Sequence, residues 1–429
     1  MKLKFNLNIK KFTNLLLVFL LYFICILINS NIGLMLLYLY SLIILWINCS
    51  KNSISLILIF YITLYFIPIF LWCLYGINIS HYTYMNSTEN IFTTLKVQTF
   101  FSILLSYNVN YIDRESHIIY TFDDFKKNKS NILFILMIIL CLICLIIGKS
   151  GNTIFESGGY GLSNKTGSAV FEYFNIFYLL AFLFSGNEKN KKFLLYLISI
   201  IYVLKSFLYG GRIEIIQHIF LIFILFFEKK FKPKNVLFML CIGYFVMFLI
   251  GSFRSNLVLD INSFQKLFGY NSITNSIVSN EADVFYSTTV FLNAEKYGII
   301  DNNYRIISSI FWIIRLFVPS SFIDETYNVI LYLQNNFTIF GGGGFFSGFV
   351  FFYFGYIGLI IVTKIISIFI NKINRTDNNI YIKTFIILFV VMLPRWYAYS
   401  SETFFKIPFY AVALLYLLRI FFIEKNRYF

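Results

Sequence analysis

The stretch from residue 341 to residue 362 reads GGGGFFSGFVFFYFGYIGLIIV. Its four glycines close a long segment, 251–344, which holds several arginines and acids. The residues after the glycines open an apolar run that continues to residue 370. Apolar runs of about 17–25 residues are long enough to cross a hydrocarbon core of about 30 Å as a helix. The junction at residue 344 therefore separates a segment expected outside the membrane from one expected within it.

The composition of the whole chain indicates the same class of protein. Of its 429 residues, 59% are hydrophobic and only 13% are charged, whereas soluble domains carry roughly 25% charged residues. The apolar runs are continuous rather than alternating, which favours helices over a β-barrel. We predict an all-α, polytopic membrane protein that forms a single integral membrane domain over residues 1–429, with the lipid bilayer as a partner.

Twelve membrane-spanning helices are predicted. Their ranges are 12–29, 32–48, 54–75, 91–106, 132–148, 168–185, 193–209, 212–227, 236–251, 345–370, 380–394 and 404–423. No small-residue cleavage site follows the first range, so we expect it to be an uncleaved helix. The fourth range is the least apolar, because it contains Lys96 and Gln98.

The segment 252–344 is predicted to be one large outer loop before the last three helices, with amphipathic or re-entrant helices inside it. Residues 305–318 are apolar enough to resemble a further span. The run is short, however, and carries Arg315 just before Pro319. We therefore expect an amphipathic helix that lies at the outer interface or dips partway into the membrane.

The formal net charge of +15 is explained by membrane topology, and no nucleic-acid partner is predicted. Lysines gather in alternate connecting loops such as 126–129 and 229–234, whereas the loop 76–90 contains neither Lys nor Arg. The positive-inside rule then places both termini in the cytoplasm.

The six cysteines lie in or at the ends of apolar runs. Cys141 and Cys144 have the spacing of a metal-binding pair, but no second pair accompanies them. We expect the cysteines to be small apolar helix residues, and we predict no metal and no other cofactor.

Arginine is distributed differently from lysine along this chain. Five of the nine arginines, but only five of the 26 lysines, fall on or near the predicted outer face. A guanidinium binds phosphate through two hydrogen bonds and keeps its charge, which a lysine ammonium does not match. We predict that these arginines bind a diphosphate; the alternative is that they reach lipid headgroups or pair with acids. They are Arg212, Arg254, Arg305, Arg315 and Arg395.

A predicted outer turn, 209–214, combines several chemically useful residues. Gly210 and Gly211 allow a ligand to approach the backbone, and Arg212 stands at a helix N-terminus that favours an anion. Glu214 and His218 follow four residues apart on one helix face. Because ionisable groups inside a membrane are costly, we predict that both are catalytic. The alternative is that Glu214, His218 and Arg212 only stabilise packing.

Two other stretches contribute candidate residues. The glycines Gly341, Gly342, Gly343 and Gly344 are predicted to admit a lipid or sugar close to the backbone, or else to provide a hinge or tight helix packing. Glu402 is a further candidate for the catalytic base, the group that takes a proton from a substrate. Among the remaining outer acids, which include Glu172, the sequence does not choose.

The chain resembles the Wzy-type oligosaccharide repeat unit polymerases of O-antigen and capsule biosynthesis. The resemblance covers most of the chain, through the spans, the inner termini and the large outer loop. Its local motifs are Gly210-Gly211-Arg212 and the glycines 341–344 that lead into Phe354-Gly355-Tyr356-Ile357-Gly358. The chain departs from the family pattern at Tyr353, where the family has Asn, and in lacking a Glu within 349–354.

The resemblance implies a metal-independent glycosyltransferase in the bacterial cytoplasmic membrane. It implies that oligosaccharide repeat units linked to undecaprenyl diphosphate are the substrates and are polymerised by block transfer on the outer face. A chain-length regulator is a further expected partner.

Two other functions stay open. An O-antigen ligase, or another glycosyltransferase acting on lipid-linked sugars, would share the fold or the substrate class. A polysaccharide flippase or transporter would share the lipid-linked substrate, although transporters often show paired halves that this sequence lacks.

Overall fold

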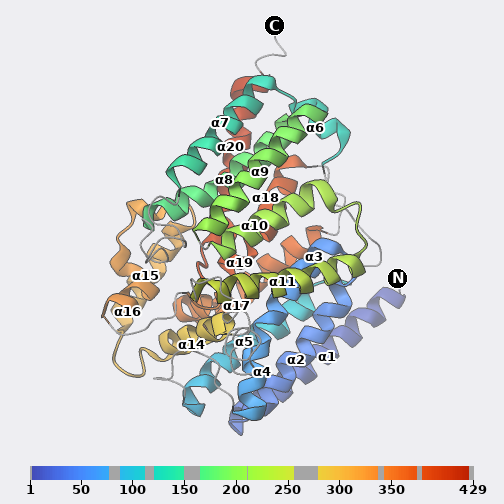
Figure 1. Ribbon diagram of the computed structural model, residues 1–429. Helices are drawn as coiled ribbons and strands as arrows, with labels where there is room; N and C mark the ends of the chain where they lie inside the picture. The colour runs from blue at the N-terminus through green and yellow to red at the C-terminus, as the bar shows by residue number, and fades with distance from the viewer. Residues whose placement is uncertain are drawn as a thin grey trace. The chain divides into compact units, whose positions relative to one another are not determined.

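The computed structural model describes residues 2–76, 87–111, 120–148, 165–209, 211–255, 279–336, 343–373 and 379–424. All regular structure within these residues is helical (Figure 1), so the prediction of an all-α protein is confirmed. Four of the described helices are long and apolar enough to cross a membrane, at Asn31–Cys49, Ser53–Tyr75, Phe346–Ile373 and Thr403–Phe422. Shorter apolar helices accompany them, at Thr13–Leu27, Asn131–Ile147, Val170–Phe184, Pro233–Val246 and Ile380–Val391.

Each of the twelve predicted ranges coincides with a helix or with two consecutive helices. The boundaries differ most at the amino end, where the first helix begins at Lys2 rather than near residue 12. Apolar helices of this number fit a membrane environment. The number of twelve crossings and the cytoplasmic position of both termini stay predictions.

The chain divides into two compact units that alternate along the sequence. Unit 1 consists of Met1–Glu115, Thr274–Asn374 and Trp396–Glu402, and unit 2 consists of Ser116–Ile273, Arg375–Arg395 and Thr403–Phe429. The predicted outer loop, 252–344, is therefore shared between the units. The predicted single membrane domain stays a prediction, and each unit is described by itself.

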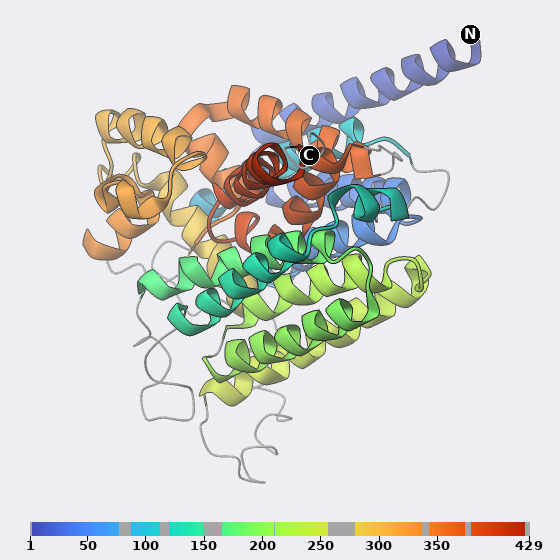
Figure 2. The ribbon, with the colours of Figure 1, turned by 90° about the horizontal axis from the view of Figure 1, so that it is seen from above.

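Unit 1 contains nine described α-helices, the end of a tenth, and two short 3-10 helices. They are α1 (Lys2–Leu27), α2 (Asn31–Cys49), α3 (Ser53–Leu64), α4 (Phe66–Tyr75), α5 (Thr88–Asn108), α14 (Ser279–Asn293), α15 (Asn302–Arg315), η2 (Ser320–Phe322), η3 (Glu325–Tyr327), α16 (Val329–Asn336) and α17 (Phe346–Ile373), with α19 (Leu393–Trp396) at the boundary to unit 2. The amino end of α1 projects from the other helices of unit 1 (Figure 2).

The helix α5 lies at the centre of unit 1 and contacts α2, α14 and α17. Hydroxyl groups join it to two of these neighbours: Ser41 Oγ lies 2.5 Å from Ser102 Oγ, and Thr94 Oγ1 lies 2.9 Å from Thr289 Oγ1. Small hydroxyl side chains allow close approach and hydrogen bonds between helices in an apolar setting. They explain why the least apolar predicted span is nevertheless buried.

The predicted outer loop contains a buried helix. In α14, Val284 and Phe291 are fully buried, and the helix packs against α5 and α17. The loop as a whole remains a prediction. The burial of α14 means that this part of the segment belongs to the core of unit 1.

The amphipathic helix predicted at 305–318 occurs as α15, shifted to Asn302–Arg315. Its polarity is inverted relative to a helix of a soluble protein. Ser308 and Arg315 are buried, whereas Ile306 and Ile310 are 58% and 53% exposed. An exposed apolar face suits a helix that lies against lipid.

The helix α17 contains a sharp break. Gly355 has φ 61° and ψ −154°, a conformation essentially restricted to glycine. The i→i−4 hydrogen-bond ladder is interrupted at this residue, and α17 consists of two half-helices on either side of it. Gly355 belongs to the Phe354–Gly358 motif that carried the family resemblance.

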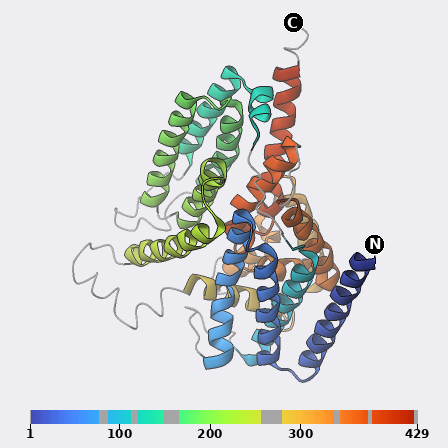
Figure 3. The ribbon, with the colours of Figure 1, turned by 90° about the vertical axis from the view of Figure 1, so that its right-hand side faces the viewer.

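Unit 2 consists of α6 (Phe122–Asn128), α7 (Asn131–Ile147), α8 (Lys165–Phe184), α9 (Lys189–Leu208), α10 (Arg212–Ile222), η1 (Phe223–Phe227), α11 (Pro233–Ser255), α18 (Ile380–Val391), α20 (Thr403–Leu418) and η4 (Arg419–Glu424). The helices α7, α8, α9 and α10 run side by side (Figure 3), and α18 and α20 pack against α8. The face of α9 that is turned inward carries Leu195, Ser199, Tyr202 and Ser206, at helical spacing.

Candidate functional site

An ion pair lies inside unit 2. Arg395 Nε of α19 is 2.5 Å from Glu172 Oε1 of α8, and the two side chains are 23% and 7% exposed. A buried carboxylate is tolerated when a cation and hydrogen bonds compensate its lost hydration. Arg395 was predicted from the sequence, and Glu172 was one of several acids that the sequence left undistinguished.

Tyr202 of α9 lies close to three charged residues of this cluster. Glu214, Glu172 and Arg395 all act on its hydroxyl electrostatically. Glu214 is 6% exposed, so unit 2 buries two carboxylates near one phenol. The structure thus brings together two of the predicted site residues, Glu214 and Arg395, from α10 and α19.

His218 lies one helical turn beyond Glu214 and is completely buried. Its Nδ1 is 3.0 Å from Oδ1 of Asn175, an oxygen that can only accept a hydrogen bond. In the tautomer that this orientation of the amide selects, Nδ1 carries the proton and Nε2 keeps a lone pair for which the described residues provide no hydrogen-bond partner. The ring is enclosed by aromatic rings whose centroids lie 4.6–5.2 Å away, those of Tyr202, Tyr178 and Phe174.

The turn between α9 and α10 sets this geometry. The Gly211 amide donates to the carbonyl of Ser206 over 2.8 Å, and Gly211 then precedes the first residue of α10. A turn this short makes α9 and α10 neighbours, which is why Tyr202 and His218 meet. Arg212 begins α10, is partly exposed and has interaction partners within the structure.

The remaining predicted residues with described side chains lie in unit 1. Arg315 donates from Nη2 to the carbonyl of Asp324 over 3.0 Å and from Nη1 to that of Tyr327 over 3.4 Å. Both Arg315 and Glu402 act electrostatically on the buried Tyr353. The Arg315 guanidinium therefore holds the chain after α15, and its diphosphate-binding role stays a prediction.

Glu402 lies near α15 because the residue before it, Ser401, is hydrogen-bonded to that helix. Trp312 Nε1 donates to Ser401 Oγ over 2.7 Å, and both side chains are buried. Arg305, in turn, is 2.6 Å from Glu295 in a half-exposed ion pair. Arg305 thus has a local partner, and its binding role is also untested.

The described glycines of the predicted glycine-rich loop pack tightly. Gly343 has φ 98°, and a Cβ there would lie 2.5 Å from the carbonyl oxygen of Ala398. The Gly344 and Phe346 amides donate to the carbonyls of Ala398 and Tyr397, each over 2.9 Å. These contacts fit the packing alternative for this stretch. Gly210, Gly341 and Gly342 lie outside the described residues, as does the side chain of Arg254 in the last turn of α11.

The sequence did not point to the partners that complete the cluster in unit 2. Asn175, Tyr202 and Glu172 lie on apolar helices, and Asn and Tyr are frequent throughout the chain. A useful signal would have been their helical spacing: Glu172 and Asn175 are three residues apart, on the buried side of α8.

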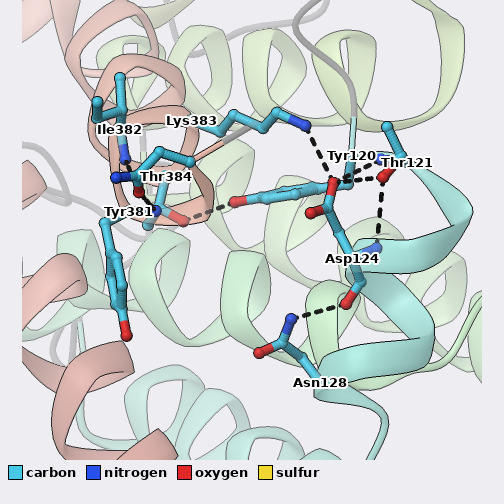
Figure 4. A network of polar contacts seen from close by, with 9 residues as sticks. Tyr120, Thr121, Asp124, Asn128, Tyr381, Ile382, Lys383 and Thr384 are labelled. Carbon is cyan, nitrogen blue, oxygen red and sulfur yellow. Dashed lines mark hydrogen bonds and ion pairs between the residues drawn. The ribbon is translucent and has the colours of Figure 1, made fainter. Parts of the chain in front are cut away.

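A second polar network of unit 2 was also not predicted (Figure 4). Lys383 Nζ lies 3.0 Å from Asp124 Oδ2, and the side chains are 7% and 14% exposed. Thr121 donates to the same oxygen from its amide and its hydroxyl, and Tyr120 is hydrogen-bonded to Thr384. Burial raises the pKa of Asp124, but the hydrogen bonds from Thr121 and Lys383 outweigh it and hold the pKa below its usual value.

The described residues contain no group of three or more His, Cys, Asp and Glu side chains placed to hold a metal ion. The cluster in unit 2 can instead supply a guanidinium, two carboxylates, a phenol and an imidazole lone pair. Such a set can bind an anion and accept a proton. Comparisons with protein-family models, with curated proteins and with solved structures found no match.

Proposed function

We propose that this protein is a membrane glycosyltransferase that polymerises oligosaccharide repeat units linked to undecaprenyl diphosphate. The reaction takes place on the outer face of a bacterial cytoplasmic membrane, and the product is a surface polysaccharide such as O-antigen or capsule. The single observation that carries the proposal is the ion pair of Arg395 with the buried Glu172, with Glu214, Tyr202 and His218 around it. The family resemblance of the sequence supports the choice of substrate.

The cost of burying ionisable groups is the physical reason for a functional interpretation. Charged side chains are rare inside membrane helices and usually mark substrate or ion paths. Unit 2 buries Glu172 on α8, and it buries Glu214 and His218 on consecutive turns of the neighbouring α10. A purely structural role would be served by apolar residues at lower cost.

In the proposed reaction, a hydroxyl of the acceptor repeat unit attacks the anomeric carbon of the growing chain. A new glycosidic C–O bond forms, and the C–O bond to the diphosphate breaks with its electron pair leaving on the diphosphate. Arg395 and Arg212 stabilise this negative charge. Glu214 or Nε2 of His218 takes the hydroxyl proton.

A deletion of the gene tests the proposal directly, with the surface glycan resolved on a gel. Polymerisation predicts that the ladder collapses to a single-repeat band, because the unit is still made, exported and attached. Loss of every band, the single repeat included, would refute the polymerase and point to a ligase or a flippase. Restoration of the ladder by the intact gene is the control.

Conservative variants test the role of the arginines. Arg212→Lys and Arg395→Lys keep the charge but lose the planar, two-bond contact with phosphate. We expect shortened or absent ladders at normal protein levels. Full-length ladders from both variants would remove the diphosphate-binding role.

One observation favours the transporter as a second candidate. The break of α17 at Gly355 produces two half-helices, and broken helices form the substrate sites of many transporters. Lipid-linked repeat units that accumulate on the inner face of the membrane after deletion would support transport. Accumulation on the outer face would support polymerisation.

A further inference from the structure

The histidine of the unit 2 cluster is hydrogen-bonded to one buried side chain. Nδ1 of His218 on α10 lies 3.0 Å from Oδ1 of Asn175 on α8, and both residues are completely buried. The amide nitrogen of Asn175 has no hydrogen-bond partner among the described residues. Within the part of the chain that the structure describes, the contact with His218 is therefore the one that accounts for a polar residue at this position of an apolar helix.

The partner of Nδ1 decides which ring nitrogen can accept a proton. A neutral imidazole carries a proton on one nitrogen and a lone pair on the other. With Oδ1 of Asn175 as the acceptor, as in the structure, the proton is on Nδ1 and the lone pair is on Nε2. With the amide turned over, its nitrogen would donate to Nδ1, and Nε2 would carry the proton. The two orientations thus make opposite predictions for the base.

The atom that the observed orientation leaves with a lone pair is Nε2. It is buried, and the described residues provide no hydrogen-bond partner for it. Buried polar atoms of this kind are rare in folded proteins, and a catalytic role is one explanation for them. Glu214, the other proposed proton acceptor, has interaction partners within the structure. Nε2 of His218 can therefore accept a proton without giving up another hydrogen bond.

The plane of the imidazole is fixed by aromatic rings. The rings of Phe174 and Tyr178 meet it edge-on at centroid distances of 5.2 and 4.9 Å, and that of Tyr202 lies 4.6 Å away. Tyr178 is itself hydrogen-bonded to Ser199 Oγ over 2.7 Å, and Tyr202 stacks on Phe174 with centroids 4.2 Å apart. Because these rings hold the imidazole in place, the variable that remains is which nitrogen carries the proton.

We propose that Asn175 is a positioning residue, which holds His218 in the tautomer whose Nε2 takes the proton of the acceptor hydroxyl. The inference rests on the proposed function, and it selects His218 rather than Glu214 as the base. The hydroxyl proton moves to Nε2, while the hydroxyl oxygen forms the new bond to the anomeric carbon and the diphosphate leaves. The imidazolium then carries a proton on each nitrogen, and the hydrogen bond from Nδ1 to Asn175 becomes a stronger, charge-assisted one.

Nitrogen NMR of the purified full-length protein measures the tautomer directly. The chain has only three histidines, so labelling with nitrogen-15 histidine gives few signals. Those of His218 are identified by their loss in His218→Gln. At alkaline pH we expect the original protein to show the proton on Nδ1. A proton on Nε2 would overturn the proposal.

Asn175→Leu removes the acceptor and keeps a side chain of similar size. We expect the preference for the proton on Nδ1 to be lost. Polymerisation, measured from the glycan ladder, should fall roughly 10–100-fold, as it does for partners that fix the tautomer of metal-binding histidines. An unchanged tautomer would overturn the proposal, and so would a full ladder from a variant whose tautomer has changed.

Asn128→Leu is the matched control. Asn128 is another buried asparagine of unit 2, 1% exposed, and its amide donates to the main-chain carbonyl of Asp124 over 2.7 Å. The tautomer of His218 and the glycan ladder should both stay as in the original protein. Losses equal to those of Asn175→Leu would overturn the proposal, because they would reflect the removal of any buried amide.

A double variant covers the case in which Asn175→Leu does not fold. Asn175→Leu with His218→Phe replaces both partners by apolar groups of similar shape, which is nearly neutral for stability. We expect normal protein levels and no ladder, and a full ladder would overturn the proposal. The NMR measurement requires no sugar transfer. A proton on Nε2 in an active polymerase would therefore refute this inference alone, whereas a failed deletion test would refute the proposed function.

Discussion

Units 1 and 2 both contain arginines that the sequence placed near the outer face, but the units use them differently. In unit 2, Arg395 pairs with a buried carboxylate beside Glu214 and Tyr202. In unit 1, Arg315 donates to main-chain carbonyls, and Arg305 pairs with a half-exposed acid. An arginine bound to carbonyls fixes a loop, whereas one paired with a buried acid can exchange that partner for another anion. The comparison therefore favours unit 2 as the location of the proposed chemistry.

The largest effect should come from breaking the buried pair of unit 2. Arg395→Met leaves the Glu172 carboxylate buried without its cation, and we expect a loss of about 3–5 kcal/mol in stability. Thermal unfolding of the detergent-solubilised protein measures it. The double variant Arg395→Met with Glu172→Gln should recover most of this stability. Glycan polymerisation that survives in the double variant would contradict a role of this pair in the chemistry, because the pair would then be structural only.

The glycine packing of unit 1 should show the next largest effect. Gly343→Ala combines a positive φ with a contact of 2.5 Å to the carbonyl of Ala398, and we expect a destabilisation of about 1–3 kcal/mol. Gly243→Ala in α11 is the control, since its Cβ would meet nothing within 4 Å. A Gly343→Ala protein of unchanged melting temperature that fails to polymerise would instead support a substrate role for this stretch.

The polar network of α6 and α18 should make a pH-dependent contribution to the stability of the folded protein. Because the pKa of Asp124 is lowered in the folded protein, its stabilising effect is present above the unfolded pKa of about 3.9 and disappears as the pH falls through the lower folded pKa. Asp124→Asn should therefore destabilise the protein at pH 7 by about 1–3 kcal/mol, which is measured as a lower melting temperature. The difference from the original protein should shrink below pH 4. A difference that stays constant down to pH 3 would exclude ionisation of Asp124 as the cause.

The smallest effect should come from the half-exposed pair of unit 1. Arg305→Gln removes one ion pair with Glu295, and such pairs contribute about 0–1 kcal/mol. We expect nearly unchanged melting and unchanged glycan ladders. A shortened glycan ladder with a normal melting temperature would support substrate binding by Arg305. The chemistry would then involve residues of unit 1 as well as unit 2.

The sequence predicted the helices well because long apolar runs leave few alternatives. It did not predict the buried helix α14, because the run 279–293 mixes acids, hydroxyls and aromatic residues. The burial of α14 depends on contacts with distant segments, those of Thr289 with Thr94 and of Thr288 with the Phe345 amide. Nor did the sequence predict the division into units, which depends on contacts between remote parts of the chain.

The candidate site was predicted in part. Ionisable residues at helix ends, such as Glu214 and Arg395, are visible in an apolar sequence because they are rare there. Their partners were not visible: Tyr202 and Asn175 are common residue types in this chain, and only the packing of α8, α9 and α10 shows that they meet His218. The role of Arg315 could not be inferred either, because main-chain carbonyl acceptors leave no trace in a sequence.

Residues 396–402 belong to unit 1 but come near the end of the chain, and this has a consequence for biosynthesis. The amides of Gly344 and Phe346 find their acceptors only in Ala398 and Tyr397, so unit 1 cannot close before the ribosome has passed residue 402. At about 5–20 residues per second, the helices up to residue 115 wait in the bilayer for roughly 15–60 s before this closure. During that interval the nascent protein is a substrate for membrane chaperones and proteases, and its yield depends on how quickly translation reaches residue 402.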